Sequence, residues 1–172
     1  TDYDDFQANS FTGTGFNLQN AGKIETNGWE LEYTWQPFDN TTISGYFAQS
    51  KGDFTTFVGG TCWDGTVFHT GQPDPGSNGD PTAEVCDRSG GRIPYNPEDR
   101  AFVALTQDFP LAAGNLFFRA EYTYASDLLT DGDLDPLTRE SGTDLINLRL
   151  GMDIDNWNST ITLWGRNITD ER

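Results

Sequence analysis

The sequence is poor in basic residues and histidine. Ten Lys and Arg stand against 27 Asp and Glu, which gives a formal net charge of -17. A nucleic-acid-binding protein must neutralise phosphates with Lys and Arg, so this balance argues against nucleic acid as a partner. The single histidine leaves little room for a catalytic triad or a two-histidine metal site. We therefore expect neither an enzyme nor a bound cofactor.

Long apolar runs are also missing. No stretch reaches the roughly 18 apolar residues that a transmembrane helix needs, and no signal-peptide pattern opens the chain. Residue 1 already lies in a strand-like pattern, which is typical of a fragment or a processed product. Aromatic residues nevertheless make up 13% of the chain, and a disordered sequence would be depleted in them. We expect one folded domain over residues 1–172.

What the sequence has instead is alternation of apolar and polar residues. In the clearest stretch, residues 116–124, Arg119, Glu121 and Thr123 point one way. Phe117 is the one apolar residue that shares their face. Because successive side chains of a strand lie on opposite faces, the stretch has one apolar and one charged face. The apolar set is Leu116, Phe118, Ala120, Tyr122 and Tyr124.

Seven such stretches occur, and most have about the ten residues that a tilted strand needs to cross a bilayer. Strands of soluble sandwiches are shorter, usually about 5–6 residues. Short connections follow Gln36, Phe109 and Ile154, and longer ones follow Phe11, Lys51 and Ser126, an alternation typical of membrane barrels. The sequence predicts an all-β fold: antiparallel up-and-down strands of a partial transmembrane β-barrel. The stretches are 2–11, 23–36, 41–51, 99–109, 115–126, 143–154 and 159–167.

Aromatic residues at or near the strand ends support a membrane barrel, whose rims carry aromatic girdles. They are Trp29, Trp35, Phe38, Phe109 and Trp157.

The two cysteines, Cys62 and Cys86, lie in one long polar segment, residues 52–97. A zinc site is a poor interpretation because His69 is the only histidine. A disulfide that closes a loop of about 25 residues is the better one, and it implies an oxidising compartment.

Three segments resemble TonB-dependent outer-membrane receptors. Asn20–Glu32 is similar to a barrel strand of the pattern N-A-G…G-x-E-x-E, Cys86–Pro97 to the loop and strand start that follow, and Gly165–Arg172 to the penultimate strand. The resemblance implies a plugged barrel of about 22 strands. It also implies a bacterial outer-membrane location and uptake of a ferric siderophore, vitamin or oligosaccharide. Outer-membrane lipid, the nutrient and the TonB complex are the implied partners.

The sequence departs from the family's full pattern. It lacks the plug domain, the N-terminal segment that contacts TonB, and the last strand with its terminal aromatic residue. This chain alone should therefore not transport anything.

Three groups of residues are candidates for function. The long external loop offers possible substrate contacts, although its aromatics would also simply cover the barrel mouth: Trp63, Phe68, His69, Arg88, Arg92 and Tyr95. Charged residues on the polar faces would face the lumen, where they would either line a translocation path or pair with one another and pack against a plug. They are Glu30, Glu32, Arg119, Glu121, Arg149 and Asp153. Asp131, Asp133 and Asp135 begin like a calcium loop, but Pro136 and Gly142 occupy the positions where an EF-hand needs Gly and Glu.

Two other classes of protein remain open. One is a secreted, disulfide-containing β-sandwich that binds carbohydrate or an adhesion partner. The other is a β-rich glycoside hydrolase module, for which the many Asp and Glu residues single out no catalytic pair.

Overall fold

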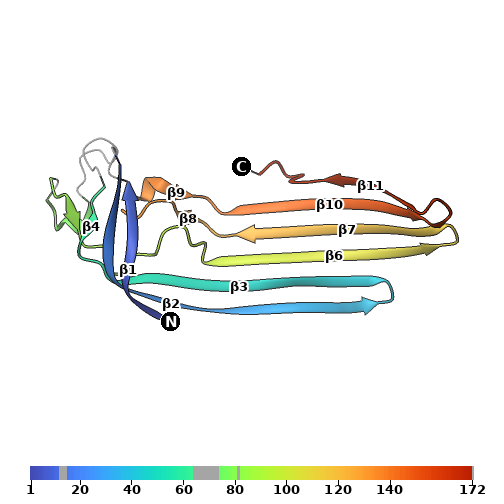
Figure 1. Ribbon diagram of the computed structural model, residues 1–172, viewed down its shortest axis with the longest axis horizontal. Helices are drawn as coiled ribbons and strands as arrows, with labels where there is room; N and C mark the ends of the chain where they lie inside the picture. The colour runs from blue at the N-terminus through green and yellow to red at the C-terminus, as the bar shows by residue number, and fades with distance from the viewer. Residues whose placement is uncertain (12–14, 64–73, 81, 172) are drawn as a thin grey trace. The chain divides into compact units, whose positions relative to one another are not determined.

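The structure, a computed structural model, describes residues 1–11, 15–63, 74–80 and 82–171. Seven long strands form one open antiparallel sheet in the order β1-β2-β3-β6-β7-β10-β11 (Figure 1). Long strands that are consecutive in sequence are thus neighbours in the sheet, and the predicted up-and-down fold is confirmed. The strands are β1 (Asp2–Phe11), β2 (Phe16–Phe38), β3 (Thr41–Thr56), β6 (Asp99–Leu111), β7 (Gly114–Ala125), β10 (Thr143–Ile154) and β11 (Ser159–Gly165).

Three tight turns join β2 to β3, β6 to β7 and β10 to β11, the last through the 3-10 helix η3 (Asp155–Trp157). Each turn has one residue with positive φ: Asn40 at 63°, Gly114 at 146° and Asn158 at 47°. Glycine and asparagine tolerate this conformation better than other residues, so the turn chemistry fixes where each hairpin reverses.

The connection between β1 and β2 is shorter than the sequence predicts. β2 begins at Phe16 rather than Lys23, and Phe16 already pairs with Phe11. Asn20, which lies before the predicted start of this strand, pairs with Gln7 inside the sheet. The antiparallel partner supplies hydrogen bonds to this polar stretch, which therefore extends the strand despite its weak alternation.

The two long connections contain short elements of their own. Between β3 and β6 lie β4 (Gly60–Thr61), η1 (Pro75–Ser77) and β5 (Val85–Cys86), and β4 pairs with β5. Between β7 and β10 lie β8 (Leu128–Leu129), η2 (Pro136–Thr138) and β9 (Arg139–Glu140), and β8 pairs with β9. β3 runs to Thr56, so the irregular segment starts later than residue 52.

The chain divides into two compact units. The loop unit comprises Thr1–Gly28, Ser50–Glu98 and Asp127–Ser141, and it contains both long connections. Its small core is Ile24, Phe54 and Phe57, with Ile93 and Leu134 packed against it. The two phenylalanine rings lie 4.9 Å apart between centroids, in a tilted arrangement that suits aromatic pairs.

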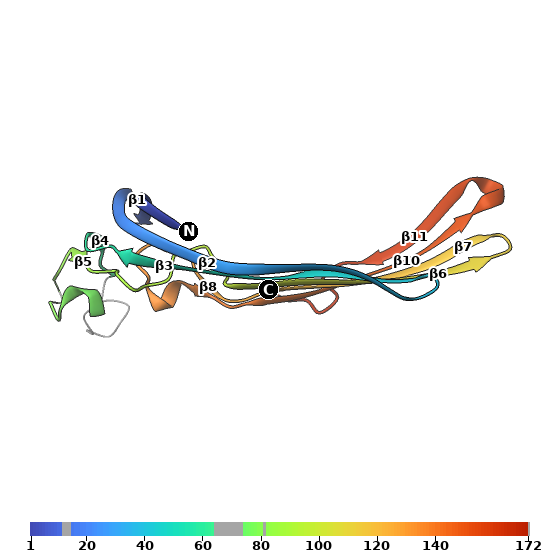
Figure 2. The same ribbon diagram turned by 90° about the horizontal axis from the view of Figure 1, so that it is seen from below.

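The strand unit comprises Trp29–Gln49, Asp99–Ser126 and Gly142–Arg172, and it contains the three tight turns. Its strands form a single layer, seen edge-on in Figure 2. Ala101 and Ala104 are the only buried apolar side chains among its described residues, so its larger apolar side chains remain on the surface. Within the described part of the chain, no helix has the length and apolar character that a membrane crossing requires.

Candidate functional site

The strand register sorts the side chains of the strand unit onto two faces. Leu150 of β10, for example, lies between Phe118 of β7 and Leu163 of β11, and all three point the same way. We call this side the apolar face. From β3 to β11 it carries Ile43, Phe47, Val103, Leu105, Phe109, Leu116, Phe118, Ala120, Tyr122, Tyr124, Ile146, Leu148, Leu150, Met152, Ile161 and Leu163.

The apolar face is accessible. Leu163 is 74% exposed, Ile161 62% and Leu150 46%. A surface this rich in exposed apolar side chains is typical of a membrane or partner interface. Register also places two polar residues on this face, Gln107 opposite Phe118 and Asp144 opposite Tyr124. The second β-layer that a soluble sandwich would place against it is not found among the described residues of this unit.

Exposed aromatic residues mark the ends of the strand unit. Trp35, Phe38, Phe109 and Trp157 lie within or close to the three tight turns. Trp29 is nine residues before Phe38 on β2, which corresponds to about 30 Å of extended strand. Alternation puts Trp29, like Tyr33, on the apolar face, where a membrane barrel carries its aromatic girdles.

The opposite face is polar. Register places four of the predicted lumen-facing residues on it, namely Arg119 and Glu121 of β7 and Arg149 and Asp153 of β10. Arg119 donates from Nε to Glu121 Oε1 at 2.7 Å and from Nη1 to Thr106 Oγ1 at 3.0 Å. Phe117 also lies on this face, where its ring covers Gly151 on the neighbouring strand. The missing side chain of the glycine makes room for the ring, which accounts for the one break in the alternation of β7.

Glu30 and Glu32 lie on β2, where their neighbour Tyr33 stacks on Phe47 of β3 at 6.0 Å between centroids. Tyr33 is therefore on the apolar face, and strand alternation puts the two exposed glutamates on the polar face. All six predicted charges thus share one side of the sheet. That this side faces the lumen of a barrel remains a prediction.

Three arginines gather in a hollow of about 290 Å³ on the polar face, which we call the arginine hollow. It is lined by Arg119, Glu121, Asn147, Arg149, Trp164 and Arg166, together with Leu148 and Gly165. Sequence reasoning missed Trp164 and Arg166, because only the β10–β11 register places them beside the other two arginines.

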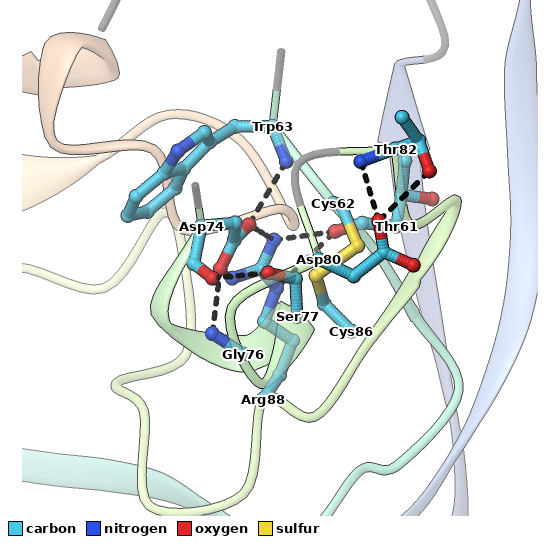
Figure 3. The surroundings of a disulfide bond; sticks show 10 residues. All are labelled: Thr61, Cys62, Trp63, Asp74, Gly76, Ser77, Asp80, Thr82, Cys86 and Arg88. Atoms are coloured by element: carbon cyan, nitrogen blue, oxygen red, sulfur yellow. Dashed lines mark hydrogen bonds and ion pairs between the residues drawn. A yellow bond between two sulfur atoms is a disulfide. The ribbon is translucent and has the colours of Figure 1, made fainter. Parts of the chain in front are cut away.

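In the loop unit, Cys62 and Cys86 form the predicted disulfide (Figure 3). The bond lies next to an ion pair between Asp74 and Arg88, which are 2% and 4% exposed. The Arg88 guanidinium donates to both carboxylate oxygens, Nη1 to Oδ1 at 2.8 Å and Nη2 to Oδ2 at 2.5 Å. Arg88 also donates to the Thr61 carbonyl and lies 5.4 Å from the centre of the Trp63 ring.

Both carboxylate oxygens of Asp74 accept more than one hydrogen bond. Asp74 accepts hydrogen bonds from the backbone N–H groups of Trp63 and Gly76 at 3.0 and 2.8 Å, in addition to those from Arg88. The pair therefore ties together the two ends of the segment that the disulfide closes. Arg88, expected as a substrate contact, has a structural role in this geometry because its donors point into the loop.

The other expected loop contacts differ in accessibility. Tyr95 is 66% exposed, and its backbone N–H donates to the Leu129 carbonyl. Arg92 is half-buried between Glu98 and Asp127, with N···O distances of 2.7 and 3.3 Å. Trp63 is half-buried against Arg88. Phe68 and His69 lie outside the described residues.

The calcium candidates serve local turns. The side chains of Asp131, Asp133 and Asp135 each accept a hydrogen bond from the backbone N–H two residues further on. Burial, reinforced by the two neighbouring carboxylates, raises the pKa of Asp133 above its ordinary value. Among the described residues, the only three metal-ligating side chains within 4.8 Å of one another are Cys62, Asp74 and Cys86. The two sulfurs form the disulfide and Asp74 binds Arg88, so this group is not a metal site.

Comparison with known proteins decides the family. Residues 1–168 match the family model described as "TonB dependent receptor-like, beta-barrel". The chain belongs to the TonB-dependent receptor family. This membership places it in the bacterial outer membrane, as the resemblance in its sequence predicts. No curated protein matches the chain.

A solved receptor has the same fold. The ferric yersiniabactin uptake receptor FyuA from Yersinia pestis superimposes with a TM-score of 0.68 at 18% sequence identity. The match covers 99% of this chain and 22% of FyuA, so the chain spans about a fifth of the length of that receptor. TonB-dependent receptors are transporters rather than enzymes as a class.

Proposed function

We propose that this chain forms part of the barrel wall and the external loops of a receptor that binds a scarce nutrient and imports it with TonB-coupled energy. The nutrient would be a ferric siderophore, a vitamin or an oligosaccharide. The observation that carries the proposal is the single-layered sheet, whose accessible apolar face suits lipid and whose other face is charged. The chain itself would have no catalytic role.

The two edges of the sheet support a larger barrel. β1 and β11 are edge strands, and in a bilayer an unpaired strand edge leaves backbone N–H and C=O groups without partners. Further strands of the intact receptor would pair with both edges and close the barrel. The polar face would then line the lumen, with Glu30, Glu32, Arg119, Glu121, Arg149 and Asp153 in contact with water or a plug.

The orientation follows from the two kinds of connection. Membrane barrels have short periplasmic turns and long external loops. The three tight turns would therefore face the periplasm, and the two long connections would face the outside, where a disulfide is stable. Trp63, Phe68, His69, Arg92 and Tyr95 would be available there for nutrient contacts.

The proposal is tested by uptake. The intact receptor is expressed in a Gram-negative strain that lacks competing receptors, and uptake of labelled ferric siderophores, cobalamin and oligosaccharides is measured with and without TonB. We expect uptake of one class, lost when TonB is absent. Uptake that is independent of TonB, or no uptake of any class by a correctly inserted receptor, would contradict the proposal.

The loop contacts are tested by binding at the cell surface. Tyr95→Ala and Trp63→Ala should each weaken binding of the imported nutrient by about tenfold, the effect of losing an aromatic contact worth about 1.4 kcal/mol. Val85→Ala is the matched control, because Val85 is 59% exposed in the same connection. Equal effects of all three substitutions would argue against specific contacts.

A further inference from the structure

The arginine hollow is strongly basic although the chain as a whole is acidic. The chain has ten Lys and Arg residues, and Arg119, Arg149 and Arg166 line this one depression. Glu121 is the only acidic residue in its lining, and it already pairs with Arg119 at 2.7 Å. The charges of the other two guanidinium groups are therefore not balanced within the hollow.

The strand register makes this imbalance costly. Arg119 of β7 and Arg149 of β10 are directly opposite each other. Like charges at directly opposite positions of an antiparallel pair repel and destabilise the sheet. In the described part of the chain, no carboxylate lies within 4.0 Å of the guanidinium of Arg149 or Arg166. A bound anion would relieve the repulsion between these guanidinium groups.

The rest of the lining holds the hollow in shape. Trp164 is opposite Arg149 on the other side, and the Arg166 guanidinium lies 5.0 Å from the centre of the Trp164 ring. The Asn147 side chain accepts a hydrogen bond from the backbone N–H of Asn167 at 2.9 Å, which fixes the chain directly after Arg166. The hollow is thus preorganised, with an indole that positions one of its three guanidinium groups.

We propose that the arginine hollow binds a small free polyanion through two or more carboxylate or phosphate groups. Planar guanidinium groups bind such oxygens with paired hydrogen bonds, and two unbalanced positive charges call for at least two negative ones. A volume of about 290 Å³ suits a compact solute, and Arg149 and Arg166 are exposed enough to meet one from solution. The inference depends on the proposed function only for the statement that this face lines the lumen.

The test uses the intact receptor, purified in detergent at low ionic strength, with citrate and pyrophosphate as probes. Calorimetry should detect binding, and the probes should raise the thermal unfolding temperature. Arg149→Gln and Arg166→Gln should each weaken binding by about tenfold or more, because each removes a charge-assisted hydrogen bond. Arg100→Gln is the matched control, since Arg100 is an exposed arginine on the polar face of β6 and does not line the hollow.

Thermal unfolding of the variants separates the outcomes. One outcome is that the probes do not bind and Arg149→Gln raises the unfolding temperature. The substitution would then only have relieved the repulsion between Arg119 and Arg149 in an empty hollow, which overturns the proposal. If the probes do not bind and both variants lower the unfolding temperature, a carboxylate of the receptor itself occupies the hollow, and a free anion is again excluded. Nutrient uptake is measured separately, so failed import with intact anion binding would count against the proposed function alone.

Discussion

Asp74 and Arg88 form a buried ion pair with two hydrogen bonds, next to the Cys62–Cys86 disulfide. They are 14 positions apart in sequence, and the same carboxylate also accepts hydrogen bonds from the backbone N–H groups of Trp63 and Gly76. A buried pair of this kind contributes little net stability when compared with apolar residues, but losing one partner leaves an unpaired buried charge. We therefore expect the pair to specify the loop conformation.

The first prediction concerns this pair. Asp74→Asn removes the carboxylate charge and leaves the Arg88 guanidinium buried without a counter-ion, which should cost the loop about 3–5 kcal/mol. Hydrogen exchange in the intact receptor should show faster exchange at Trp63, Gly76 and Arg88, whose backbone or side chains depend on the pair. Strand amides of β6, β7 and β10 should keep their protection.

Arg139→Gln is the control for that experiment. Arg139 is 59% exposed and pairs with Asp127 at 2.8 Å. An exposed pair is worth about 0–1 kcal/mol, so the control should leave exchange in the disulfide loop unchanged. Equal loosening by both substitutions would contradict a special role for Asp74 and Arg88.

The second prediction concerns the disulfide. Reduction of the Cys62–Cys86 disulfide opens a loop whose two ends are 24 positions apart in sequence. The chain-entropy model gives about 3–4 kcal/mol for a loop of this size. Hydrogen exchange before and after reduction should show faster exchange around β4 and β5, with the seven long strands still paired. Loss of protection in the long strands would mean that the loop is not a separate addition to the sheet.

The third prediction tests the apolar face. Leu150→Lys puts a charge where lipid should be, and Thr162→Lys puts the same charge on the polar face one position away in the β10–β11 register. A lysine near the bilayer midplane on a lipid-facing position costs about 2–4 kcal/mol. Urea titration of the receptor in lipid vesicles should show this loss for Leu150→Lys and little change for Thr162→Lys. The reverse order of the two would mean that the faces are assigned the wrong way round.

Much of the strand unit is predictable from periodicity. The stretch 143–154 is predicted to the residue, and β7 is displaced by a single position, because the membrane requires long strands with strict alternation. β2 is longer than predicted, since β1 stabilises residues 16–22 through pairing that no local pattern signals. Strand ends in a sheet depend on the partner strand as well as on the sequence of the strand itself.

The sites are less predictable because they depend on register and on distant contacts. The cysteines alone indicate a disulfide, but nothing near Arg88 in sequence indicates that Asp74 will neutralise it. Trp164 and Arg166 join Arg119 and Arg149 only through the β10–β11 pairing. A shift of one residue in that register would move both side chains to the apolar face.

The last prediction concerns the pH dependence of the loop around Asp133. Burial, with a further contribution from Asp131 and Asp135, raises the pKa of Asp133 above its ordinary value of 3.8. Folding therefore favours the protonated form of Asp133, so the contribution of this group to loop stability is fully present below pH 3.8 and is lost as the pH rises through the raised pKa. Asp133→Asn keeps an acceptor for the Asp135 N–H but removes the charge.

We expect Asp133→Asn to slow hydrogen exchange of residues 131–138 at neutral pH, after correction for intrinsic rates, and to have no effect below pH 3.8. Asp87→Asn is the control with the opposite sign. Its side-chain and backbone hydrogen bonds with Ser89 lower the pKa of Asp87, so its ionised form is the favoured one. Asp87→Asn should speed local exchange at neutral pH, and slower exchange in both variants would show that the general acidity of the chain, rather than the burial of Asp133, is responsible.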